Sequence, residues 1–220
     1  MNCCAECSTA YNHTFNAKMA ARDLKRYKKR GPSESTKKLL NVIFNRPGKG
    51  SNSKSLIDIG GGIGAIGLES VANGIESITS IDVSSEYLSA AEKEVVEQGL
   101  QNRFTFYTGD VVQLATNIDP ADIVTLDKSI CCYQDYASLV ETSVSMARNI
   151  VGIVIPREVW WVIWINAIGN LFRKLKGDTF RTFVHPVTKI RSIITNHGFT
   201  ELATQRSREW EILVFRVNGN

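Results

Sequence analysis

Short apolar runs alternate with longer amphipathic segments along the chain after residue 54. The apolar runs are rich in β-branched and aliphatic residues, and they predict five buried strands. These strands are expected at residues 55–59, 77–83, 103–107, 121–127 and 149–155. Apolar positions at helical spacing predict helices at residues 64–73, 85–98, 135–147 and 158–176. Such alternation is typical of a parallel sheet with right-handed crossovers and helices on both faces, so a doubly wound α/β fold is expected.

The last part of the chain breaks this rhythm. A predicted helix at residues 187–197 ends at Gly198, and two apolar runs follow at residues 199–205 and 210–217. Only a short polar turn separates these runs, and so short a connection permits antiparallel pairing alone. We therefore expect a Rossmann-like, doubly wound, seven-stranded and mostly parallel sheet that ends in an antiparallel strand pair.

The first 54 residues differ from the rest in charge. The chain carries a formal net charge of +4, but twelve Lys and Arg residues lie between Lys18 and Lys54, against two acidic residues. Such a field attracts an anionic substrate, a membrane surface or nucleic acid, and the alternative is a solvated helix face. Residues 15–27 predict an amphipathic helix, and residues 46–54 a linker rich in Pro, Gly and Ser. We expect a helical preface at residues 1–54 and one larger domain at residues 55–220.

Composition narrows the class of protein further. The chain has 220 residues, of which 43% are hydrophobic and 22% charged, as in ordinary globular proteins. The longest apolar stretch is interrupted by Pro156, Arg157 and Glu158, so no transmembrane segment is expected. The five cysteines lie in two clusters with no signal peptide before them, which favours a cytoplasmic location. The first cluster, Cys3, Cys4 and Cys7, resembles part of a zinc or redox site but lacks a fourth ligand nearby, so incidental thiols and no metal are expected.

A glycine-rich segment, LIDIGGGIGAIGLE at residues 56–69, follows the first strand. Glycines at a strand end allow a sharp turn and a close approach of a ligand to the backbone. Gly62, Gly64 and Gly67 match the dinucleotide pattern G-x-G-x-x-G, and Asp82 lies where such sites hold a ribose. The segment therefore predicts a site for a nucleoside-bearing cofactor.

A second pattern overlaps the first. Asp58, Gly60, Gly62 and Gly64 form an acid-x-Gly-x-Gly-x-Gly motif, which resembles the first motif of class I S-adenosylmethionine-dependent methyltransferases. An ionised carboxylate is costly to bury without a partner, and a dinucleotide pyrophosphate supplies none. A methionine amino group does supply one, so Asp58 favours the methyltransferase interpretation over an NAD-dependent oxidoreductase.

The resemblance extends to later motifs in the same order. The strand SITSIDV, the segment TGDV at residues 108–111 and the segment DIVTLDKSICCY at residues 122–133 are similar to the ribose, adenine and active-site motifs of that family. The resemblance implies an enzyme that transfers a methyl group from S-adenosylmethionine to a small-molecule acceptor. The tryptophan-rich segment at residues 158–176 and the basic stretch before residue 54 indicate an acceptor that is hydrophobic or anionic. The N-terminal pattern and the segment SICCYQDY at residues 129–136 resemble a group of small bacterial methyltransferases, which is loosely similar to porphyrin and quinone methylating enzymes. The cofactor-binding residues that the resemblance implies are Asp58, Gly60, Gly62, Gly64, Asp82, Val83, Gly109, Asp110, Val111 and Asp127.

The sequence gives fewer indications of the residues that bind the methyl acceptor than of those that bind the cofactor. Tyr133 and His185 are candidates for proton transfer, with a pocket wall and a packed histidine as the respective alternatives. A nucleic acid acceptor is not expected, because DKSI after the fourth strand lacks the Asn/Asp-Pro-Pro-aromatic motif. By resemblance, the helix at residues 15–27 closes over the site as a lid and places Tyr27 near the acceptor.

Three tryptophans fall within five residues of the predicted helix at residues 158–176. Trp160 and Trp164 lie on an apolar stripe, which is either core, a wall for the acceptor, or a surface for peripheral membrane contact. A further alternative for the whole chain is a noncatalytic nucleoside-binding protein of the same fold. Stabilisation by S-adenosylmethionine rather than NAD(H), followed by turnover, distinguishes the three functions.

Overall fold

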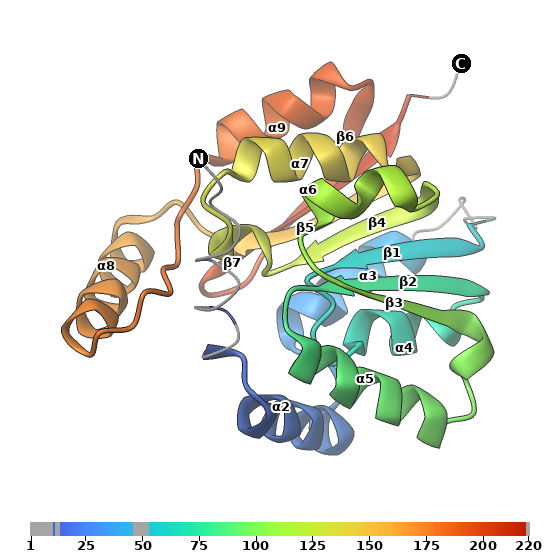
Figure 1. Cartoon of the computed structure of the whole chain (residues 1–220). Helices are drawn as coiled ribbons and strands as arrows, with labels where there is room; N and C mark the ends of the chain where they lie inside the picture. Colours follow the sequence, from blue (N-terminus) through green and yellow to red (C-terminus); the bar gives the residue numbers. More distant parts are fainter. Residues whose placement is uncertain (1–10, 12–13, 46–52, 219–220) are drawn as a thin grey trace.

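The computed structural model describes residues 11, 14–45 and 53–218. Seven strands form one sheet in the order β3-β2-β1-β4-β5-β7-β6 (Figure 1). Strands β1 to β5 run parallel, and β7 is antiparallel to both β5 and β6. The predicted mostly parallel sheet with its terminal antiparallel pair is confirmed. The strands are β1 Ser55–Ile59, β2 Ser77–Asp82, β3 Phe104–Thr108, β4 Ala121–Asp127, β5 Ala147–Pro156, β6 Phe199–Arg206 and β7 Trp210–Val217.

Helices cover both faces of the sheet. Helices α6, α7 and α9 lie on one face, and α3, α4 and α5 lie on the other (Figure 1). Helix α2 packs outside α5, while α8 stands away from both layers (Figure 1). The helices are α2 Ala17–Arg30, α3 Glu34–Phe44, α4 Ala65–Val71, α5 Ser85–Glu97, α6 Val111–Leu114, α7 Tyr136–Ser145, α8 Trp160–Leu175 and α9 Val187–Asn196.

The central strands are buried on both faces, because each is covered by helices above and below. Along β1, Leu56 joins one apolar cluster and Ile57 joins the other. The same alternation occurs along β4, where Ile123 and Val124 point to opposite faces. Continuous aliphatic runs rather than polar-apolar alternation are therefore the correct signal for these strands.

Helix α3 is an integral part of the core, although it lies in the basic stretch before residue 54. Leu39 and Ile43 pack over β5 at Gly152, where an added Cβ would lie 2.9 Å from Leu39 Cδ1 and 3.0 Å from Ile43 Cδ1. Ser33 caps the helix by accepting a hydrogen bond from the Thr36 amide. The sequence analysis did not predict α3, and its predicted linker at residues 46–54 lies largely outside the described residues.

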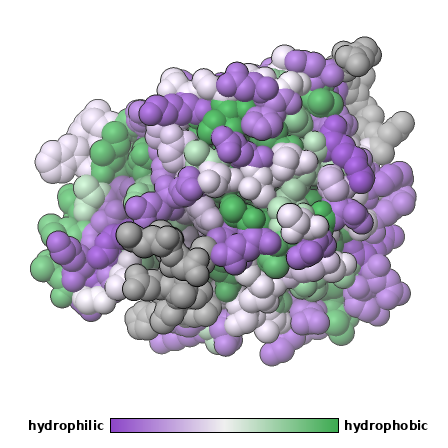
Figure 2. Space-filling model, turned by 45° about the horizontal axis from the view of Figure 1, so that its top comes forward, coloured by the Kyte–Doolittle hydropathy of each residue, from purple (hydrophilic) through white to green (hydrophobic). Residues whose placement is uncertain are grey.

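Helix α8 places most of its apolar side chains in solvent. Trp160 is 75% exposed and Trp164 is 63% exposed, while Val162 is the one buried residue of the helix. Figure 2 shows apolar side chains gathered at the end of the molecule where α8 lies. The core interpretation of these two tryptophans is therefore wrong. None of the described helices is long and apolar enough to span a bilayer.

Candidate functional site

The carboxyl ends of four parallel strands bring the predicted motifs to one edge of the sheet. The glycine loop follows β1, Asp82 ends β2, Gly109 and Asp110 follow β3, and Asp127 ends β4. Parallel neighbours end at a shared edge, and open α/β sheets bind ligands at this edge. The order of the strands thus assembles segments that lie far apart in the sequence.

The glycine loop is a tight turn between β1 and α4. Gly60, Gly62 and Gly64 adopt φ angles of 70°, 56° and 78°, a region that favours glycine. An added Cβ at Gly60 would lie 2.5 Å from Ser129 Cβ, and one at Gly61 would lie 2.3 Å from the Ser80 hydroxyl oxygen. At Gly62 the nearest atom is Tyr87 Cδ1 at 3.6 Å, so this glycine faces more open space.

Asp82 ties the loop to the end of β2. Its Oδ2 accepts a hydrogen bond of 2.9 Å from the Gly62 amide, and its Oδ1 accepts one of 2.9 Å from the Ser84 amide. Burial raises the pKa of the Asp82 carboxyl above its usual range, and these backbone donors oppose that rise. Asp82 therefore lies against Gly62 at the end of β2, where the sequence predicted it, with Val83 next in the chain.

Asp58 is the most deeply buried acid of the site. It lies in the middle of the sheet, on β1 between β2 and β4, and the Thr125 hydroxyl donates to its Oδ1 at 2.8 Å. Burial raises the pKa of Asp58 to about 7, against the opposing effect of the Thr125 hydrogen bond. At neutral pH this carboxyl is thus poised between its neutral and charged forms.

We expect the Asp58→Asn variant to be more stable than the wild type at pH 8 and equally stable near pH 3. The native pKa of about 7 exceeds the ordinary value of 3.8, so the native state holds a proton that the unfolded chain has released. Wild-type stability therefore falls as the pH rises from about 4 to 7. The difference should reach up to about 4 kcal/mol, since each pKa unit corresponds to about 1.4 kcal/mol.

Thermal unfolding of ligand-free protein from pH 3 to pH 8 measures this difference. Asp122→Asn is the matched control at the opposite edge of the sheet. Burial acts to raise the pKa of Asp122, but hydrogen bonds from the Lys54 and Ser55 amides lower it overall. This control should therefore lose stability relative to the wild type as the pH rises. A pH-independent difference for Asp58→Asn would contradict the raised pKa.

Asp110 and Tyr133 form a hydrogen-bonded pair beside the loop. The Tyr133 hydroxyl donates to Asp110 Oδ2 at 2.8 Å, and the Val112 amide donates to Asp110 Oδ1 at 3.0 Å. Asp110 also caps the short helix α6, which begins at Val111. The structure thus brings together two residues that the sequence placed on different motifs.

His185 is hydrogen-bonded to the backbone of Tyr133. Its Nε2 donates to the Tyr133 carbonyl oxygen at 2.9 Å, and its ring stacks near Tyr136 and Phe183. Burial lowers the pKa of this imidazole, which favours its neutral form. These contacts match the packed-histidine alternative, in which His185 fixes the position of the Tyr133 backbone.

Asp127 forms a hydrogen bond with Thr36 of α3. The Thr36 hydroxyl donates to its Oδ2 at 2.5 Å, and the Lys128 ammonium lies 3.4 Å from its Oδ1. Lys128 itself has a positive φ of 63° at the sharp turn after β4. These contacts give Asp127 a role in joining β4 to α3, which the sequence analysis did not foresee.

An aromatic cluster closes over the loop from the N-terminal side. The Phe15 ring packs edge-on against Tyr87 at 5.7 Å and against Phe180 at 5.3 Å between centroids. The Ser84 hydroxyl donates to the Phe15 carbonyl oxygen at 2.7 Å, and the Tyr87 hydroxyl donates to Asp23 at 2.7 Å. The sequence analysis missed Tyr87 and Phe180, although Tyr87 lies only five residues after Asp82.

Three predicted acceptor residues lie away from this cluster. Tyr27 packs partly buried against the core, and its hydroxyl donates to Glu69 of α4 at 3.0 Å. Trp160 and Trp164 point outward from α8. The beginning of the lid, at Phe15 and Asp23, contacts the site instead.

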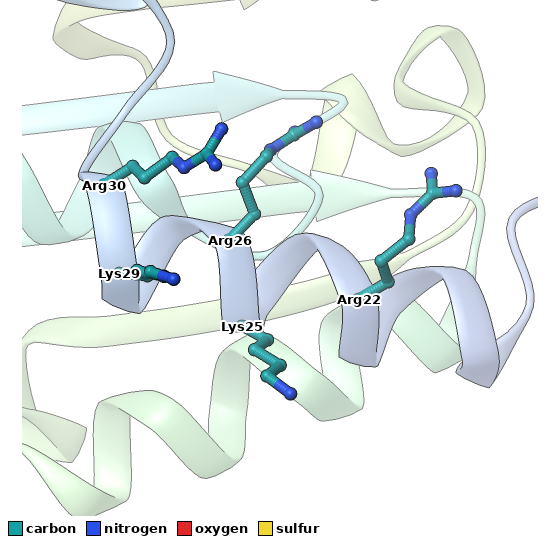
Figure 3. Close-up of a pocket in the computed structure, with 5 residues that line it drawn as sticks. All are labelled: Arg22, Lys25, Arg26, Lys29 and Arg30. Atoms are coloured by element: carbon teal, nitrogen blue, oxygen red, sulfur yellow. The ribbon is translucent and has the colours of Figure 1, made fainter.

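The basic stretch of the lid forms a solvated surface. A hollow of about 280 Å³ lies between Arg and Lys side chains of α2 alone (Figure 3). Arg22 and Arg26 pair with Asp23 at 3.5 Å and 3.7 Å, so part of this charge is neutralised. The hollow is not the cofactor site, because no residue of the glycine loop lines it. The lining residues are Arg22, Lys25, Arg26, Lys29 and Arg30.

The cysteines fall into two groups. Cys3, Cys4 and Cys7 lie outside the described residues. Cys131 and Cys132 are adjacent after β4, with their sulfur atoms 3.7 Å apart as free thiols. Within the described part of the chain, no three His, Cys, Asp or Glu side chains are grouped to hold a metal ion.

Comparisons of this chain with a family of known proteins and with solved structures both give matches to methyltransferases. Residues 56–149 match the family described as "Methyltransferase domain". A comparison with curated protein sequences found no match. Among solved structures, magnesium protoporphyrin IX methyltransferase from Synechocystis PCC 6803 with bound S-adenosylmethionine is similar, with a TM-score of 0.69 at 18% identity. That similarity covers 99% of this chain and 100% of the other.

A second similar structure has a different acceptor chemistry. An N-methyltransferase from Bradyrhizobium japonicum WM9, in complex with S-adenosyl-L-homocysteine, has a TM-score of 0.62 at 15% identity. The similarity covers 84% of this chain and 87% of the N-methyltransferase chain. The family match spans the glycine loop, Asp82 and Asp110, and the structural matches extend over most of the chain. Residues 56–149 therefore match a methyltransferase domain, and the chain as a whole has the fold of these two methyltransferases.

Proposed function

We propose that this protein transfers a methyl group from S-adenosylmethionine to a small-molecule acceptor. The observation that carries the proposal is the contact of Gly62 with Asp82 at the carboxyl edge of the sheet, within the residues that match the methyltransferase family. A positive-φ glycine beside a partly buried acid suits a ligand that brings hydroxyl groups close to the backbone.

The residues around the loop fit such a cofactor. The Ser80 and Ser129 hydroxyls are buried beside the loop, and neither has a hydrogen-bond partner among the described residues. Such buried polar groups are normally satisfied, so a polar ligand or water is expected there. In our proposal, Asp82 and Val83 hold the ribose, and Asp58 lies under the methionine part. The other proposed contacts are Gly60, Gly62 and Gly64 to the methionine part, and Gly109, Asp110 and Val111 to the adenine.

The protein's own task is to position the acceptor and to exclude water. S-adenosylmethionine supplies an electrophilic methyl group when bound, so little acid-base chemistry is required of the chain. Tyr133 is held by Asp110 through its hydroxyl and by His185 through its carbonyl, which suits a fixed wall of the acceptor pocket. The lid contacts at Phe15 and Asp23 would keep water from that pocket.

An apolar or anionic acceptor agrees best with these surroundings. Phe15 contributes a partly exposed aromatic ring beside Tyr87, backed by the buried Phe180, and α2 adds a basic exterior. A magnesium porphyrin, the substrate named for the similar enzyme from Synechocystis, is both flat and apolar over much of its surface. We propose an acceptor of this general chemistry without assigning the individual compound.

A ligand-stabilisation assay tests the proposed function. S-adenosylhomocysteine should raise the melting temperature with the logarithm of its concentration above Kd, and NADH should leave it unchanged, because only a ligand of the native state stabilises it. Labelled methyl transfer to fractionated cell extract then identifies the acceptor. Stabilisation by NADH alone would overturn the proposal in favour of a dinucleotide enzyme. Binding of S-adenosylhomocysteine without any turnover would favour a noncatalytic nucleoside-binding protein.

We expect Asp82→Ala to weaken S-adenosylhomocysteine binding by about 10- to 100-fold. Hydrogen bonds to a charged group are each worth about 1.5 to 3 kcal/mol, and each 1.4 kcal/mol corresponds to a tenfold change in affinity. Calorimetry measures the change. Asp122→Ala is the matched control, because Asp122 also accepts two backbone hydrogen bonds but lies at the opposite edge of the sheet. Equal affinities for the two variants would contradict the ribose assignment.

A further inference from the structure

The outer face of α8 is the main apolar surface of the described chain. Nine large hydrophobic residues are exposed among the described residues, and eight of them lie on this one helix. Their spacing places them side by side along the helix, because positions three and four apart share a face. The eight residues are Trp160, Ile163, Trp164, Ile165, Ile168, Leu171, Phe172 and Leu175.

The inner face of α8 is polar, and this polarity fixes the orientation of the helix. The Asn166 and Asn170 amides donate to the Thr182 carbonyl oxygen at 3.0 Å and 2.7 Å. Asn170 Oδ1 in turn accepts from the Thr182 amide at 3.0 Å, and the Arg173 guanidinium lies over the Phe180 ring. The polar side chains thus face the protein, and the apolar ones face outward. A rotation of α8 to bury the tryptophans would break all of these contacts.

The charge of α8 has one sign. No acidic residue lies between residues 159 and 177, whereas Arg173, Lys174 and Lys176 lie at the end of the helix. Lys174 and Lys176 are exposed. At 1.5 Å per residue, the 16 residues of α8 extend about 24 Å. An exposed helix with tryptophans in its first turns and cations in its last turn is suited to lie flat at a lipid surface.

We propose that α8 docks this protein onto the interface of an anionic lipid bilayer. The apolar face would enter the boundary between head groups and acyl chains, and the cations would contact the anionic head groups. Charge complementarity favours an anionic lipid surface over a second copy of the chain, because α8 carries no acidic residue that could pair with the cations of a second α8. The inference does not depend on methyl transfer.

Docking would also set the position of the lid. The segment that returns from α8 carries Phe180, which is buried against Phe15 and Tyr11. Tyr11 donates a hydrogen bond to the Cys132 carbonyl oxygen beside the site. The aromatic cluster over the glycine loop is thus joined directly to the segment that holds α8.

Vesicle flotation tests the proposal with the full-length chain. The probes are vesicles of phosphatidylcholine alone and vesicles that contain about 30% phosphatidylglycerol. We expect the wild type to bind the anionic vesicles, and the double variant Trp164→Glu, Ile168→Glu to lose at least about tenfold in binding, because it places charge on the lipid-facing surface. Lys174→Glu, Lys176→Glu should remove the preference for anionic vesicles.

Val96→Glu is the matched control, since Val96 is 57% exposed but lies on α5. It should bind vesicles like the wild type. Failure of the wild type to bind either vesicle, or equal binding by the α8 double variant, would overturn the proposal. So would a wild-type dimer that the double variant dissociates, measured by analytical ultracentrifugation, because a second copy would then cover the face. S-adenosylhomocysteine affinity, measured on the same proteins without lipid, reports separately on the proposed function.

Discussion

Gly62→Val is expected to abolish measurable S-adenosylhomocysteine binding in a protein that still folds. Gly62 has a φ of 56°, where a β-branched side chain is strained by about 1 to 3 kcal/mol. Its Cβ would enter the open side of the loop, near Tyr87 and next to the amide that donates to Asp82. Because the added methyl groups occupy the space proposed for the cofactor, we expect an affinity loss of at least about 100-fold, or about 2.8 kcal/mol.

The loss of binding must be separated from backbone strain. Gly99 has a φ of 70°, and an added Cβ there meets no atom within 4 Å. Gly99→Val should therefore lower the melting temperature by a few degrees, as Gly62→Val does, and leave affinity unchanged. Calorimetry and thermal unfolding of both variants make the comparison. Normal binding by Gly62→Val would remove the glycine loop from the proposed cofactor site.

Deletion of residues 1–30 is expected to leave the sheet folded and to accelerate ligand release. Ala20 is the one fully buried residue of α2, and Tyr27 is the α2 residue packed partly buried against the core, so the deletion leaves the sheet and its other covering helices in place. The deletion removes Phe15 and Asp23, however, which contact Ser84 and Tyr87 beside the glycine loop. A missing lid leaves the ligand open to solvent, so we expect S-adenosylhomocysteine to dissociate at least about tenfold faster, equivalent to about 1.4 kcal/mol.

Stopped-flow fluorescence measures dissociation, and circular dichroism confirms that the sheet is folded. Asp23→Ala tests the same contact with a single substitution and should accelerate release in the same direction. Lys28→Ala is the control, since Lys28 joins α2 to Glu94 and Glu97 farther along α5. An unchanged dissociation rate in the truncated protein would show that the N-terminal segment is a solvated helix with no role in closing the site.

The positions of the strands along the chain, the mostly parallel sheet and most helices were predictable because local and tertiary preferences agree. Strands β1 and β4 have the predicted bounds, and the glycine loop lies at the predicted strand end. Helix α3 was not predicted, because the high charge of residues 18–54 masks the apolar positions Leu39 and Ile43. The apolar spacing of α3 is present in the sequence, but the site where it packs, at Gly152, lies on a strand more than 100 residues away.

The proposed cofactor residues were easier to identify than the acceptor side. Asp82 and Gly62 each lie at the end of a regular element, so their proximity follows from the parallel sheet. The contacts of Phe15 with Tyr87 and Phe180 join three distant segments that share no sequence pattern. Periodicity predicted the apolar stripe of α8 correctly, but it could not tell which face of the helix meets the protein. Asn166 and Asn170 decide that orientation through Thr182.

The position of β7 has a consequence for how the chain reaches its native state. Strand β7 is the last strand in chain order, yet it lies between β5 and β6 in the sheet. Until residues 210–217 pair, the aliphatic strand β5 has one unpaired edge, and unpaired apolar edges promote aggregation during synthesis. During synthesis this edge of β5 therefore stays unprotected until nearly all of the described chain has emerged.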